Sequence, residues 1–82
     1  MDEVDNVRLL TRISEIVVKI NVEREKCAFL EIAGHVGWIQ VRVAASSEEY
    51  KNMLYTSDYV DFKDTKALHR VVGALEGFLR PE

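Results

Sequence analysis

The sequence predicts a small α+β fold with the element order α-β-β-β-α, in which two helices pack on one face of a small antiparallel sheet. Helical spacing of apolar residues over 4–20 and 64–80 predicts a helix near each end of the chain. Between them, residues 27–33 and 37–44 alternate apolar and polar side chains around a glycine-containing turn. We expect residues 1–82 to form one globular domain.

The composition is that of a folded domain with a small core. Apolar residues make up 48% and charged residues 30% of the 82 residues, which excludes a disordered or low-complexity segment. A domain of this size buries only about 60% of the surface that its unfolded chain exposes. We therefore expect stabilisation by a partner chain, with a homodimer as the first candidate.

The compartment expected from the sequence is the cytoplasm. The chain begins with the acidic stretch Met1-Asp2-Glu3-Val4-Asp5, whereas a secretory signal begins with basic residues. No stretch approaches the roughly 20 apolar residues that cross a bilayer. The single cysteine, Cys27, excludes a disulfide framework and fits a reducing compartment.

The first predicted helix carries an apolar stripe at positions i, i+4, i+7 and i+11. Its members are Leu9, Ile13, Ile16 and Ile20, and Leu10 and Val17 widen the same face. Asn21 is expected to end this helix, because asparagine tolerates the left-handed conformation common at helix ends. Residues 18–23 also alternate as a strand would, but the helical stripe is longer and is preferred.

Residues 27–33 and 37–44 are predicted to form a β-hairpin. Ala28, Leu30 and Ile32 share one face with Ile39, Val41 and Val43, because side chains alternate along each strand. Gly34 and Gly37, in the segment between the strands, can supply the positive φ that tight turns need. The opposite face then carries Phe29, Glu31, Trp38, Gln40 and Arg42.

Residues 46–56 fit two interpretations. Ser46 and Glu49 have the spacing of a capping box, which would start a helix. Alternatively, residues 46–49 form a polar turn that leads into a third strand at 50–56. We favour the strand, because two strands alone make a weak sheet.

The last helix is predicted over residues 64–80. Its apolar stripe consists of Leu68, Val71, Val72, Leu75, Phe78 and Leu79. Asp64 is placed to cap its first turn, and Pro81 follows as prolines commonly do past a helix end.

No group of residues in the sequence predicts catalysis or cofactor binding. Cys27 and His35 would lie at opposite ends of a strand about 20 Å long, so they cannot act as nucleophile and base. Asp58, Asp61 and Asp64 recur every third residue, whereas a calcium loop has its acids at alternate positions. We therefore predict no catalytic residue, no metal and no cofactor, and a protein that is not an enzyme.

Two surfaces are candidates for contact with a partner. On the sheet face away from the helices, Phe29 and Trp38 are expected to lie near each other with Glu31, Gln40 and Arg42 around them; tryptophan and arginine are enriched at interface centres. On the last helix, the side opposite the apolar stripe contains Lys66, His69, Arg70, Gly73, Gly77 and Arg80. Two glycines four residues apart on a helix surface would permit the close approach of another backbone or a phosphate.

The predicted element order is similar to that of the double-stranded-RNA-binding domain, with Gly34-His35 where that family has a hairpin loop containing glycine and histidine. In that family a cluster of lysines opens the second helix and clamps phosphates. Here the matching segment, Asp64-Thr65-Lys66-Ala67-Leu68, begins with an acid and holds one lysine. The resemblance is therefore confined to the element order and the loop.

The function expected from the sequence is a non-enzymatic protein-interaction module that binds itself or another protein. The alternative is a nucleic-acid-binding module that uses Lys66, Arg70 and Arg80, although the net charge of −3 makes nucleic acid an unlikely partner. A further alternative, a small-ligand carrier or an enzyme, would need convergent polar groups of a kind that the sequence does not indicate.

Overall fold

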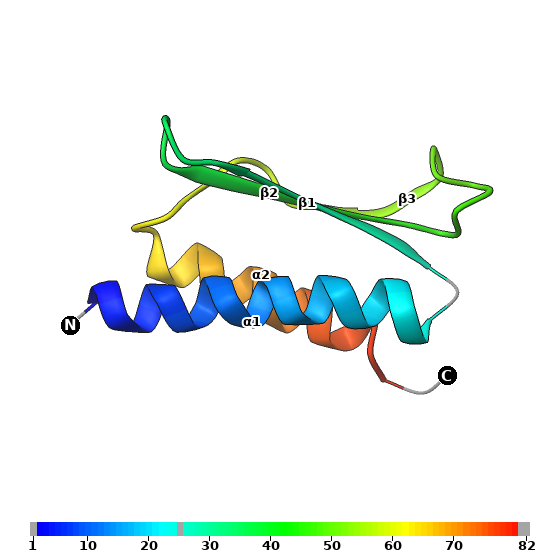
Figure 1. Cartoon of the computed structure of the whole chain (residues 1–82), viewed down its shortest axis with the longest axis horizontal. Helices are drawn as coiled ribbons and strands as arrows, with labels where there is room; N and C mark the ends of the chain where they lie inside the picture. The colour runs from blue at the N-terminus through cyan, green and yellow to red at the C-terminus, as the bar shows by residue number, and fades with distance from the viewer. Residues whose placement is uncertain (1, 25, 81–82) are drawn as a thin grey trace.

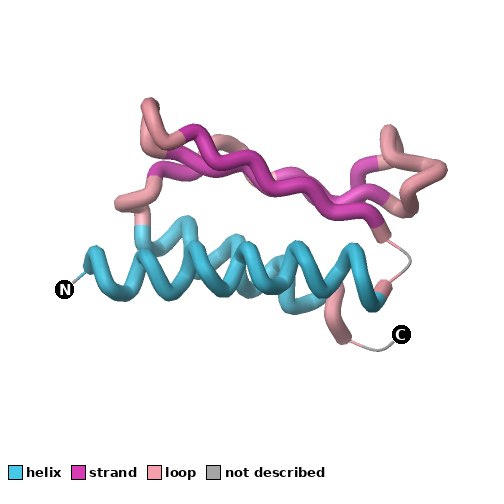
Figure 2. The backbone as a smooth tube through the Cα atoms, viewed as in Figure 1, coloured by secondary structure: helices cyan, strands magenta, loops and turns pink. Residues whose placement is uncertain are grey.

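The computed structural model describes residues 2–24 and 26–80, which form two layers (Figure 1). One layer is a four-stranded antiparallel sheet, and the other consists of two helices that cover one face of it (Figure 2). The elements in chain order are α1 (Asp2–Glu23), β1 (Cys27–Ala33), β2 (Trp38–Ala44), β3 (Met53–Thr56), β4 (Val60–Asp61) and α2 (Thr65–Gly77). The predicted α+β class and the placement of the helices are confirmed, but β4 was not predicted.

Helix α1 continues past Asn21, so the predicted end of this helix is wrong. The Asn21 side chain donates to the carbonyls of Val17 and Ala28, both at 3.0 Å, and accepts from the Ala28 N–H at 2.9 Å. The Asn21 side chain therefore pairs with both backbone groups of Ala28, as a neighbouring strand would. The alternative of a strand at 18–23 fails because Ile13, Ile16 and Ile20 meet on one helical face and are fully buried.

Strands β1 and β2 form the predicted hairpin. Seven residue pairs run in unbroken register from Cys27 opposite Ala44 to Ala33 opposite Trp38. The turn is closed by hydrogen bonds from the N–H groups of Val36 and Gly37 to the Ala33 carbonyl. Gly37 has a φ of +74°, and it is the residue that uses the conformational freedom of glycine here.

Residues 46–56 combine both sequence interpretations. The Ser46 hydroxyl accepts from the Glu49 N–H at 3.0 Å, as in a capping box, but the chain then turns instead of forming a helix. Asn52 donates to the Glu49 carbonyl and accepts from the Ala45 N–H, which returns the chain to β2. The third strand is confirmed, but it starts at Met53 instead of residue 50.

Strand β2 is central, and β3 and β4 share the edge of β2 that faces away from β1. β3 pairs with the second half of β2, and β4 pairs with Trp38 and Ile39 at its start. Ser57, which is buried, lies between β3 and β4 in the chain and pairs with β2 although it belongs to neither strand. Its hydroxyl accepts from the Val41 N–H and its own N–H donates to the Val41 carbonyl, both at 2.8 Å.

Helix α2 begins as predicted and ends earlier. The Asp64 carboxylate accepts from the Ala67 N–H at 3.1 Å, which confirms it as the N-cap. The helix ends at Gly77, and Phe78 and Leu79 continue as a turn that still packs against the core. Pro81, expected to follow the helix, lies outside the described residues.

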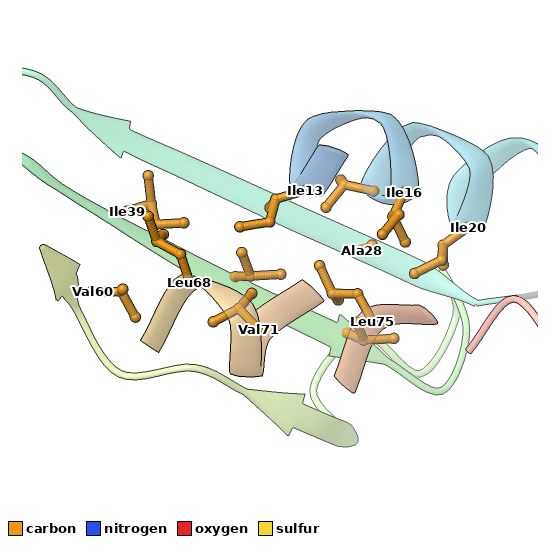
Figure 3. Packing of buried hydrophobic residues seen from close by; sticks show 12 residues of the cluster. Ile13, Ile16, Ile20, Ala28, Ile39, Val60, Leu68, Val71 and Leu75 are labelled. Atoms are coloured by element: carbon orange, nitrogen blue, oxygen red, sulfur yellow. The ribbon is translucent and has the colours of Figure 1, made fainter. Parts of the chain in front are cut away.

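The core lies between the sheet and the helices (Figure 3). Ile39, Val41 and Val43 from β2 are at most 1% exposed and meet Leu68, Val71 and Leu75 of α2 and the isoleucines of α1. Asn6 is also buried and ties the starts of the two helices together. Its side chain donates to the Phe62 carbonyl and accepts from the Thr65 hydroxyl, both at 2.8 Å.

Ser57→Ala should lower the free energy of unfolding by about 1–3 kcal/mol, because it leaves the buried N–H of Val41 without an acceptor. Urea denaturation followed by circular dichroism measures the change. Ser47→Ala, at an exposed serine, is the matched control and should stay within about 0.5 kcal/mol. Equal stability of the two variants would show that Ser57 does not support the centre of the sheet.

Candidate interaction surface

Both helices of the described residues lie on one face of the sheet, and we call the opposite face the open sheet face. Residues paired directly across strands share a face, so the register places Phe29 with Arg42, Glu31 with Gln40, and Ala33 with Trp38. On the other side of β2, Thr56 pairs with Arg42 and Asp61 pairs with Trp38. All five residues predicted for this face are therefore on it.

The register contradicts the expected proximity of Phe29 and Trp38. Trp38 lies opposite Ala33, four residues along β1 from Phe29, which corresponds to about 13 Å. The alternation of side chains along a strand predicts on which face of the sheet each residue lies. The length of the hairpin turn decides which residues of the two strands lie opposite each other. The open sheet face therefore has two separate aromatic sites, one at each end of the hairpin.

The first aromatic site consists of Trp38 and Tyr59. Their ring centroids are 4.2 Å apart with an interplanar angle of 47°, close to the lower limit for aromatic pairs. Tyr59 remains 64% exposed, while Trp38 is half-buried beneath it. The sequence analysis missed Tyr59, although the buried Val60 between Tyr59 and Asp61 is the alternation typical of a strand.

The second aromatic site consists of Phe29 and Arg42. The guanidinium carbon of Arg42 lies 5.0 Å from the centre of the Phe29 ring, which is a cation–π distance. Both side chains are half-buried. Stacking on the ring holds the guanidinium in place, so less conformational entropy is lost when a partner carboxylate binds it.

The outer side of α2 is a separate surface. Lys66, Arg70, Gly73 and Gly77 are exposed there, as are His69 and Arg80. Within the described part of the chain, no atom lies within 4 Å of a Cβ built on Gly73 or Gly77, so neither glycine accommodates a close intramolecular contact. Because the apolar stripe of α2 faces the sheet, this surface and the open sheet face lie on different sides of the molecule.

Two aspartates line the same cleft as Arg70 of α2. Arg70 lines a cleft of about 490 Å³ together with Asp58, Asp64, Tyr55 and Tyr59. Burial raises the pKa of the Tyr55 phenol, whose ring packs near Phe78 at a centroid distance of 6.3 Å. The carboxylates reduce the positive potential at Arg70, which disfavours phosphate there.

An exposed ion network joins α1 to α2. Arg12 donates to Glu15 at 2.8 Å and to Glu76 of α2 at 3.2 Å, and Lys19 lies 3.9 Å from Glu15. The hydrogen bond from Arg12, reinforced by the charges of Arg12 and Lys19, lowers the pKa of Glu15 below its ordinary value. The hydrogen bonds to Glu15 and Glu76 raise the pKa of Arg12. This network links the exposed sides of the two helices and does not involve the open sheet face.

The described residues do not assemble a group typical of catalysis or metal binding. Among the side chains that the structure describes, those of residues 5–24 and 26–80, no three His, Cys, Asp or Glu cluster as metal ligands would. Cys27 is a half-buried thiol at the start of β1, and His35 lies in the turn after the other end of that strand. No helix in the described part of the chain is long and apolar enough to span a membrane.

Comparison of the chain with protein-family models, curated proteins and solved structures finds no match.

Tyr59→Ala should expose Trp38, the single tryptophan, and shift its fluorescence emission to the red with stronger acrylamide quenching. The free energy of unfolding should fall by about 0.5–1.5 kcal/mol, the range of an aromatic pair. Tyr50→Ala is the matched control, since Tyr50 is also half-exposed but contacts Lys51 instead. Identical spectra for both variants would contradict the Trp38–Tyr59 contact.

Proposed function

We propose that this chain is a non-enzymatic protein-interaction module that binds another protein through its open sheet face. The observation that carries the proposal is the pair of aromatic sites, Trp38 with Tyr59 and Phe29 with Arg42, on the sheet face that neither helix covers. Tryptophan, tyrosine and arginine are the residues most enriched at the energetic centres of protein interfaces.

The chemistry of the face favours a protein over other ligands. Its charged groups have both signs, with Glu31 and Asp61 against Arg42, and Gln40 and Thr56 add neutral polar groups. Apolar centres within a polar surround are typical of protein contact surfaces. A partner that presents apolar side chains and a carboxylate toward Arg42 would match both aromatic sites.

Trp38→Ala should weaken binding of the partner by at least about 2 kcal/mol, or roughly thirtyfold in Kd, as truncation of a central interface residue does. The free energy of unfolding should change by no more than about 1 kcal/mol, because Trp38 lies outside the core. The full chain, immobilised through its C-terminus, captures the partner from a lysate of the source cells. Isothermal titration calorimetry on the purified partner then gives the Kd of each variant.

The matched control is Tyr50→Ala, an exposed aromatic residue in the turn before β3, which should bind as tightly as the parent chain. Partner binding that is unchanged in Trp38→Ala and Arg42→Ala would refute the proposed contact surface. A loss of about 3–5 kcal/mol of folding stability in Trp38→Ala would instead identify Trp38 as a core residue.

The nucleic-acid alternative predicts salt-dependent binding through Lys66, Arg70 and Arg80. We expect fluorescence anisotropy with double-stranded DNA and RNA at physiological salt to give nothing tighter than the roughly 10⁻⁴–10⁻⁶ M of non-specific binding. The acidic residues beside Arg70 support this expectation. Submicromolar binding abolished by Lys66→Glu with Arg70→Glu would favour the nucleic-acid function.

A further inference from the structure

Among the residues that the structure describes, no strand lies beside the outer edge of β1. The sheet order places β1 at one end, and all seven of its residues pair with β2 alone. Natural proteins protect an edge of this length with charged side chains, especially lysine, with proline or with a bulge. β1 contains no lysine or proline, its one charged residue is Glu31, and its pairing with β2 runs without a register shift.

Asn21 shows which backbone groups of β1 point outward. Because the Ala28 N–H and C=O both bond to the Asn21 side chain, they point away from β2. Orientation alternates along a strand, so the N–H and C=O groups of Leu30 and Ile32 also point outward. Among the described residues no group bonds to these four, so the Asn21 cap covers one end of the edge and the rest is open.

On the helix side of the sheet, the side chains along this edge, Leu30 and Ile32, are apolar. Ile32 lies opposite the buried Ile39 and so belongs to the helix side of the sheet, yet it is 61% exposed. Leu30, on the same side, is half-buried against the core. The open backbone groups are therefore accompanied by an apolar surface that faces the layer of the helices.

A stripe on α1 continues this apolar surface below the edge. Projected at about 100° per residue, one ~120° sector of α1 holds Val7, Leu10, Thr11, Ser14, Val18, Asn21 and Val22, with no charged side chain from the described residues. Asn21 of this sector reaches β1, whereas Arg12, on the opposite side of the helix, reaches Glu76 of α2. The sector therefore lies on the flank of α1 below the β1 edge, and Val7, Val18 and Val22 are 59–76% exposed there.

We propose that a second copy of this chain covers both features, with β1 paired antiparallel to the β1 strand of the partner subunit. A two-fold axis perpendicular to the sheet joins the two sheets edge to edge and places the two α1 helices side by side beneath them. An isolated peptide strand would satisfy the edge but leave the α1 stripe bare. A second copy supplies a strand and an uncharged helix flank together.

The charge of Glu31 selects the register. An axis through Glu31 would place two carboxylates directly opposite each other, which is destabilising. An axis through Ile32 pairs Ile32 with the partner's Ile32, Leu30 with the partner's Gly34, and Glu31 with the partner's Ala33. This register pairs the outward groups of Ile32 with those of the partner's Ile32, brings Leu30 beside the turn that begins at the partner's Gly34, and leaves the Asn21 cap on Ala28 in place.

Size-exclusion chromatography with light scattering on the full chain tests the proposal. At about 100 μM the mass should be twice the 9.4 kDa of the chain, and it should fall toward 9.4 kDa on dilution. Ile32→Lys and Ile32→Pro should both be monomeric at that concentration with unchanged circular dichroism. The proline removes only an outward N–H, so the β1–β2 pairing is retained. Val18→Lys should weaken the dimer through the helix flank.

Leu54→Lys is the matched control, at an exposed residue of β3 near the opposite edge of the sheet, and it should remain dimeric. In a Cys27→Ser background, Ile32→Cys should form a disulfide-linked dimer under mild oxidation, because the paired Cα atoms would be about 5.5 Å apart. Leu54→Cys in the same background should not.

A parent chain that is monomeric at about 100 μM would overturn the proposal, leaving the edge available to a strand from another protein. A dimer that persists in both Ile32 variants and dissociates in Trp38→Ala would also overturn it, because self-association would then use the open sheet face. A variant that loses partner binding but remains dimeric tests the proposed function of the open sheet face and leaves the dimer proposal standing.

Discussion

The backbone of β2 is the constraint on which the rest of the structure depends. One face of this strand is covered by both helices, and its core side chains are at most 1% exposed, so its polar groups have little access to water. Every N–H and C=O buried in such a strand requires a partner. β1 supplies partners along one edge, whereas the other edge is served in turn by β4, Ser57 and β3.

Three polar side chains form hydrogen bonds with backbone N–H or C=O groups that no neighbouring strand or helical turn pairs. Ser57 bonds to Val41 where two short strands do not meet, Asn21 caps the outward groups of Ala28, and Asn6 joins the starts of the helices through Phe62 and Thr65. Hydrogen bonds of this kind contribute modestly when made, and they cost more when one partner is lost from a buried site such as that of Ser57 or Asn6. Asn21 ties the end of α1 to the start of β1, and Asn6 ties α1 to the segment that leads into α2.

Because both helices pack on one face of the sheet, the opposite face and the outer edge of β1 are parts of the sheet that a partner can reach. The helices bury the aliphatic face of the hairpin, so the aromatic and charged face remains accessible. They lie below the sheet, and apart from the Asn21 cap on Ala28 their described residues make no hydrogen bond to the outer edge of β1. In the proposed dimer, the two open sheet faces would lie on the same side of one continuous sheet. Each dimer would then present two equivalent contact surfaces, which raises the avidity for a multivalent partner.

The sequence by itself determined the fold class, both helices, the hairpin and the face on which each hairpin residue lies, because these follow from local periodicity of side chains. It also located Asp64 as a cap, since its acceptor and donor are three residues apart. The tertiary structure decided the separation of Phe29 from Trp38, the contact of Tyr59 with Trp38, the existence of β4 and the role of Asn21. Each of these depends on the hairpin register or on a contact between side chains and backbone of different elements, and composition and periodicity do not encode such contacts.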